Sequence, residues 1–94
     1  MPVSFESRVC TPPHVVSRRL DDELVLLNLD SESYFGLDDV GTRMWEALSS
    51  SDSVEAGFQQ LLAEYDVDET TLRADVERLL EQLVDAGLVE LGGR

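Results

Sequence analysis

The chain has 94 residues, of which 43% are hydrophobic and 29% charged, the size and balance of one small globular domain. Twenty acidic residues against seven basic ones, all of them arginine, give a formal net charge of −13. Nucleic acids and anionic membranes attract cationic proteins, so this charge argues against both as partners.

Three short extended runs joined by turns are predicted between residues 14 and 37. Residues 14–20 and 23–29 form the first two, and the second is apolar on both alternating faces, which predicts a central strand covered on each side. Residues 30–33 have the composition of a turn, and the aromatic run 34–37 forms the third strand. Strands joined by such short turns predict an antiparallel meander.

From Asp38 onward the apolar residues recur with a helical period of about 3.6. Asp38 or Asp39 is expected to cap a first helix, which the serine run 49–51 ends. Asp52 and Glu55 have the spacing of a capping box and predict the start of a second helix. The chain therefore passes from sheet to helix at this point.

A third helix is predicted from a cap at Asp68 to Gly87, which suits the left-handed position after a helix end. Residues 88–91 follow it as a short apolar tail. The order of the elements predicts an α+β, winged-helix-like fold, βββααα, in a single domain over residues 1–94 with an ordered core at about 14–91.

The third helix has a wider apolar arc than one packed stripe requires. Leu80 and Val84 lie on one flank of this stripe, next to Arg73 and Glu77. The two apolar side chains either complete the core or form the floor of a peptide groove, in which the two charged ones fix the register. The stripe itself comprises Leu72, Val76, Leu79, Leu83 and Ala86.

The strand at residues 34–37 is last in the meander and is therefore expected at an edge of the sheet. It carries no lysine, proline or inward charge, the usual protections of an edge against pairing with another chain. Such an edge is either covered by the chain's own ends, residues 3–9 or 88–91, or accepts a strand from a partner.

The sequence lacks the residue sets that most catalytic and metal sites need. Cys10 is the only cysteine and His14 the only histidine, so neither a disulfide within the chain nor a zinc site is expected. There is no phosphate-binding glycine loop, no signal peptide and no apolar run near the ~20 residues of a membrane span. We expect a cytoplasmic binding module without catalytic residues or cofactors, in which Cys10 is an incidental thiol.

Several segments together resemble the signature of PqqD-like proteins: residues 27–30 (LNLD), 34–37 (YFGL), 40–48 (VGTRMWEAL) and 75–89. The resemblance covers about residues 14–91 and implies a domain that binds the leader of a ribosomally made precursor peptide as an added strand. By position, the pairing edge comprises Ser33, Tyr34, Phe35 and Gly36, and the helix side comprises Arg73, Val76, Glu77, Leu80 and Val84.

Within this family the chain is most similar to the free-standing recognition proteins of lasso-peptide pathways. The resemblance implies delivery of the precursor to a leader peptidase and then to a macrocyclase. Other outcomes stay open at this point: a PqqD-like chaperone of a different peptide pathway or of a quinone-cofactor pathway, and an acyl or peptidyl carrier protein. The carrier alternative rests on Ser53, which lies between an aspartate and a valine as a carrier attachment serine does.

Overall fold

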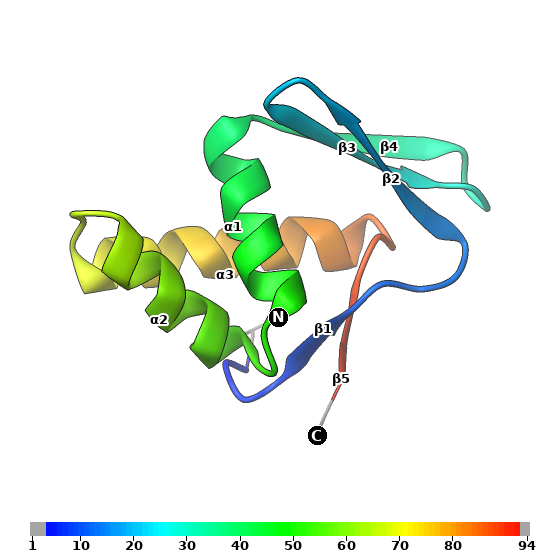
Figure 1. Ribbon diagram of the computed structural model, residues 1–94. Coiled ribbons are helices and arrows are strands. Elements are labelled where there is room, and N and C mark those ends of the chain that lie inside the picture. Colours follow the sequence, from blue (N-terminus) through cyan, green and yellow to red (C-terminus); the bar gives the residue numbers. More distant parts are fainter. Residues whose placement is uncertain (1–3, 93–94) are drawn as a thin grey trace.

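The computed structural model describes residues 4–92 and has the predicted α+β order with two short strands added (Figure 1). The elements are β1 (Arg8–Cys10), β2 (Val15–Leu20), β3 (Glu23–Asn28), β4 (Ser33–Leu37), α1 (Asp39–Ser50), α2 (Val54–Glu64), α3 (Glu69–Asp85) and β5 (Glu90–Gly92). The predicted meander is confirmed, because β2, β3 and β4 pair antiparallel with β3 in the centre. Neither β1, which precedes the start expected for the ordered core, nor β5 is among the elements predicted from the sequence.

The two added strands pair with each other and not with the meander. Arg8 pairs with Gly92 and Cys10 with Glu90, so that β1 and β5 form a separate antiparallel ribbon. Figure 1 shows this ribbon and the three-stranded sheet on different sides of the helices, with α1 running between them. The described parts of the chain's two ends therefore pair with each other and leave β4 uncovered.

The prediction that the central strand is covered on each side is wrong. Leu24 and Leu26 of β3 are buried, but Val25 and Leu27 on the opposite face are only half-buried, and Leu29 just beyond the strand is 59% exposed. The helices pack against one face of the sheet, and no described residue forms a layer on the other.

Side-chain caps begin all three helices. Asp38 accepts a hydrogen bond from the Gly41 N–H at the start of α1, and Asp68 does the same for α3. The cap of α2 is Ser53, which accepts from the Ala56 N–H, and not Asp52 as predicted. The three-stranded sheet also excludes the carrier-protein alternative, since carrier domains are helical throughout.

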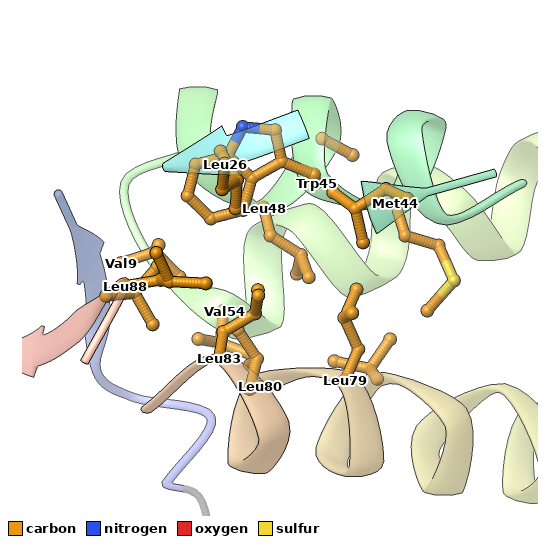
Figure 2. Close-up of a cluster of buried hydrophobic side chains, with 14 of the residues drawn as sticks. Val9, Leu26, Met44, Trp45, Leu48, Val54, Leu79, Leu80, Leu83 and Leu88 are labelled. Atoms are coloured by element: carbon orange, nitrogen blue, oxygen red, sulfur yellow. The ribbon is translucent and has the colours of Figure 1, made fainter. Parts of the chain in front are cut away.

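The core lies where the three helices meet the inner face of the sheet. Leu79, Leu80 and Leu83 project from α3 into the same cluster as Leu48 of α1 and Val54 at the start of α2 (Figure 2). Val9 of β1 and Leu88, which follows α3, close one side of this cluster. No helix within residues 4–92 is long and apolar enough to cross a bilayer.

Candidate functional site

β4 lies at an edge of the sheet, as predicted, and of the two alternatives for this edge the described residues show the uncovered one. The strand order β2-β3-β4 puts β4 at one side of the sheet, and no other described strand pairs with it. Ser33, Tyr34 and Gly36 are exposed, Tyr34 by 74%, and Phe35 is half-buried. A Cβ added at Gly36 would meet no atom within 4 Å, so nothing covers the sheet face toward which residue 36 points.

A groove of about 490 Å³ lies between β4, the start of α1 and one flank of α3. Its apolar lining comes from Phe35, Leu37, Val40, Met44 and Leu79. Val40 is 51% exposed, whereas Leu37, Met44 and Leu79 are at most 9% exposed and belong to the core. The groove therefore has a fixed floor and an accessible apolar mouth.

The rim of the groove is polar. It is formed by Asp38 at the start of α1 and by Asp75, Arg78 and Gln82 of α3. The guanidinium of Arg78 lies 3.3 Å from the Asp75 carboxylate, and Asp38 is occupied as the cap of α1. Two acids against one arginine leave the rim with a small negative charge.

The groove uses the opposite flank of α3 from the one predicted. Asp75, Arg78 and Gln82 face the groove, whereas Glu77 and Val84 do not line it and are half-buried elsewhere on the helix. The helical period identified the core stripe correctly. It does not determine which of the two flanks of that stripe turns toward the sheet.

Two of the predicted helix-side residues are part of the core. Val76 and Leu80 have no exposed surface. The prediction that Leu80 forms the floor of a groove is therefore wrong, because the first residues of α2 and the rest of the core cluster cover it. The alternative in which Leu80 completes the core is the one found.

Arg73, also predicted to contact a peptide, holds three parts of the chain together. Its guanidinium lies 4.3 Å from the ring centre of Phe5 and 4.6 Å from that of Phe58, and the two rings meet edge to face. It also lies 3.5 Å from the carboxylate of Glu55. The sequence did not reveal this cluster, since Phe5 stands in a segment without periodicity.

Ion pairs away from the groove link the sheet to α1, and α1 to α2. Arg19 of β2 donates to Glu46 of α1 at 2.6 Å, and Arg43 of α1 donates to Glu64 of α2. The hydrogen bond from Arg19 lowers the pKa of Glu46, and the one from Arg43 lowers the pKa of Glu64. These contacts stabilise the fold and lie outside the groove.

The parts of the groove can bind a polypeptide. An open strand edge offers backbone N–H and C=O groups, and the adjacent apolar mouth accepts side chains. Within the range 4–92 there is no cluster of three side chains of the kinds that hold metal ions.

Comparisons with known proteins agree with this geometry. The family model described as coenzyme PQQ synthesis protein D (PqqD) matches residues 23–89. The structure of TbiB1 in complex with the TbiA(beta) leader peptide is similar, with 40% identity, a TM-score of 0.79, and coverage of 86% of this chain and 94% of that one. A lasso peptide synthetase B1 complexed with the leader peptide has 25% identity, a TM-score of 0.78, and coverage of 88% and 98%.

No curated protein matches the chain significantly. The family match extends from β3 to the residues just before β5 and includes every element that lines the groove. On this match and the two structural similarities, the chain belongs to the PqqD family.

Proposed function

We propose that this protein binds the leader segment of a ribosomally made precursor peptide in lasso-peptide biosynthesis, as a strand added to β4. The observation that carries the proposal is the open edge of β4 beside an apolar groove. The two similar structures described above each contain a leader peptide, which supports this class of guest.

The guest strand gains affinity from backbone hydrogen bonds to β4 and specificity from its alternate side chains. Side chains on one face of the guest enter the groove at Phe35, Val40 and Leu79. Side chains on its other face lie beside Tyr34 and extend the outer face of the sheet.

In this proposal the protein is a non-catalytic cytoplasmic partner. It captures the leader and delivers the precursor to a leader peptidase and to the macrocyclase of the same pathway. The site residues proposed here are Ser33, Tyr34, Phe35 and Gly36 on the sheet side. On the helix side, Asp75, Arg78, Leu79 and Gln82 replace the flank predicted from the sequence.

The proposal is tested with a matched pair of charge insertions. Val40 at the groove mouth and Val67 between α2 and α3 are 51% and 45% exposed, so aspartate is tolerated at both. Val40→Asp puts a charge against apolar guest side chains, and we expect leader affinity to fall by at least about tenfold. Val67→Asp lies outside the groove and is expected to leave it unchanged.

The measurement is fluorescence anisotropy with two labelled peptides. One is the leader of a candidate precursor, taken from the short open reading frames that neighbour this chain's gene, and the other is the TbiA(beta) leader peptide. Absence of binding by the unaltered protein to both peptides, or equal affinities of the two aspartate variants, would contradict the proposal.

A further inference from the structure

Within the described part of the chain, the core contains only two buried polar side chains. Asn28 is 6% exposed and Thr42 is 2% exposed, while every other core residue is apolar. A buried polar group is costly unless its hydrogen bonds are made, and both of these side chains make them. Asn28 of β3 pairs with the first residue of β4, and Thr42 of α1 contacts its last residue. β4 forms one wall of the groove.

Asn28 joins the hairpin between β3 and β4 to the end of α3. Its amide nitrogen donates to the backbone oxygens of Gly87 at 3.2 Å and Ala86 at 3.5 Å. Its side-chain oxygen accepts from the N–H groups of Asp30 and Ser31 in the turn. One side chain therefore connects the hairpin that carries β4 to the helix that forms the opposite wall.

Gly87 is fitted to this contact from the helix side. It has a φ of +72°, which favours glycine, and a Cβ there would lie 3.0 Å from the amide nitrogen of Asn28. The end of α3 thus approaches the hairpin as closely as the backbone allows.

Thr42 fixes the other end of β4. Its hydroxyl donates to the backbone oxygen of Leu37, the last residue of the strand, at 3.2 Å. Asn28 pairs with Ser33, the first residue of β4, so the two polar side chains hold the two ends of the strand. Between these ends the outer edge of β4 stays open.

A guest strand needs walls at a set separation. Its backbone must lie about 4.8 Å from β4 to form hydrogen bonds, while its side chains contact α3 at the same time. Hydrogen bonds fix such a spacing because they depend on distance and direction, whereas apolar packing is non-directional.

We infer that Asn28 and Thr42 are positioning residues for the guest strand: they set the distance of β4 from α3 and from α1, and through it the affinity for the peptide. The inference rests on the function proposed above. Asn28 and Thr42 are buried, so they affect binding through the position of β4 and not by contact with the guest.

The inference is tested with variants that remove the donor group of Asn28 or of Thr42 and keep the shape of the side chain. Asn28→Asp retains the oxygen that accepts from the turn and loses the donor to Ala86 and Gly87. Thr42→Val retains the shape and loses the donor to Leu37. Leu61→Val, which alters a fully buried side chain of α2 outside the groove, is the control for general destabilisation.

The first readout is leader affinity under conditions in which all variants are almost fully folded. We expect Asn28→Asp to bind about tenfold more weakly, because it loses the donor to two backbone oxygens and its carboxylate is repelled by them. We expect Thr42→Val to bind about threefold more weakly, because it loses one hydrogen bond. Leu61→Val is expected to bind as the unaltered protein does. If the two polar variants bind as tightly as Leu61→Val, the inference is wrong although the proposed function stands.

The second readout needs no peptide. Spin labels at Tyr34→Cys in β4 and Gln82→Cys in α3, with Cys10→Ser as background, report the distance between the two walls. Asn28→Asp should lengthen and broaden this distance, and Leu61→Val should not. An unchanged distance in Asn28→Asp contradicts the inference, even if the unaltered protein binds no leader and the proposed function itself fails.

Discussion

The two flanks of α3 differ in polarity, and the more polar one, rather than the more apolar one, borders the groove. The flank with Leu80 and Val84 is the more apolar, and it is the one that the protein covers with its own residues. The flank with Asp75, Arg78 and Gln82 is polar, and it is the one that borders the open groove.

This difference has a physical reason. A site that stands empty in water before its partner arrives is most stable when its rim is polar and its apolar area is small. Excess apolar width on a helix of a small domain is instead consumed by the core, because such a domain has little other material with which to bury surface. In this protein, the surplus apolar residues of α3 belong to the interior, and charged residues beside a strand edge line the groove.

The largest expected effect comes from a charge on the covered flank. Leu80→Asp places a carboxylate where no surface is exposed. We expect the free energy of unfolding to fall by more than about 3 kcal/mol, enough to unfold much of the population. Urea unfolding followed by circular dichroism measures it. Gln82→Asp, on the exposed flank of the same helix, is the control and should stay folded.

A smaller loss is expected at the cluster that covers the first turns of α3. Phe5→Ala removes the ring that contacts Phe58 and Arg73. We expect the free energy of unfolding to fall by about 2 kcal/mol, while the affinity for the leader stays the same. Thermal unfolding and anisotropy on the same sample separate the two effects. A loss of affinity in the fully folded variant would show that the site reaches this flank.

Charge reversal distinguishes the two flanks directly. Arg73→Glu loses its contacts with two rings and with Glu55, and should lower the stability by about 1 kcal/mol while affinity is unchanged. Arg78→Glu, at an exposed position on the rim, should change affinity and leave the melting temperature almost unchanged. The opposite pattern would return the site to the flank predicted from the sequence.

The smallest expected effect is on the ion pair between Arg43 and Glu64, which lies outside both flanks of α3. Arg43 lowers the pKa of Glu64 in the folded protein, so this pair stabilises the fold above the ordinary pKa of a glutamate and less as the pH falls through the lowered value. Glu64→Gln should therefore melt slightly below the unaltered protein at pH 7. The gap should close below about pH 4, which melting curves over a pH series measure. A gap that stays constant with pH would contradict the assigned pair.

Local signals predicted most of the fold. Alternation and turn composition located the three strands of the meander, and the change to a period of 3.6 located the three helices. The cap of α2 was misplaced by one residue because Asp52 and Ser53 are both good cap residues, and only the backbone path selects between them. The strands β1 and β5 are too short to show a period, and their pairing joins residues from the two ends of the chain.

For the proposed site, the sequence predicted only the sheet side of the groove that the structure contains. The composition of residues 33–36 sufficed to identify an unprotected edge. A helical wheel has two flanks that are equivalent in the sequence, and the path of α1 and α2 determines which of them faces β4. That path depends on contacts between distant residues, such as the close packing of Gly57 against Leu48, and not on a local pattern.

The pairing of Arg8 with Gly92 has a practical consequence for work on this protein. Both strands of the ribbon lie outside the groove, so a fluorescent label attached within the ribbon would lie away from β4. A domain labelled in this way would keep its groove accessible to a peptide.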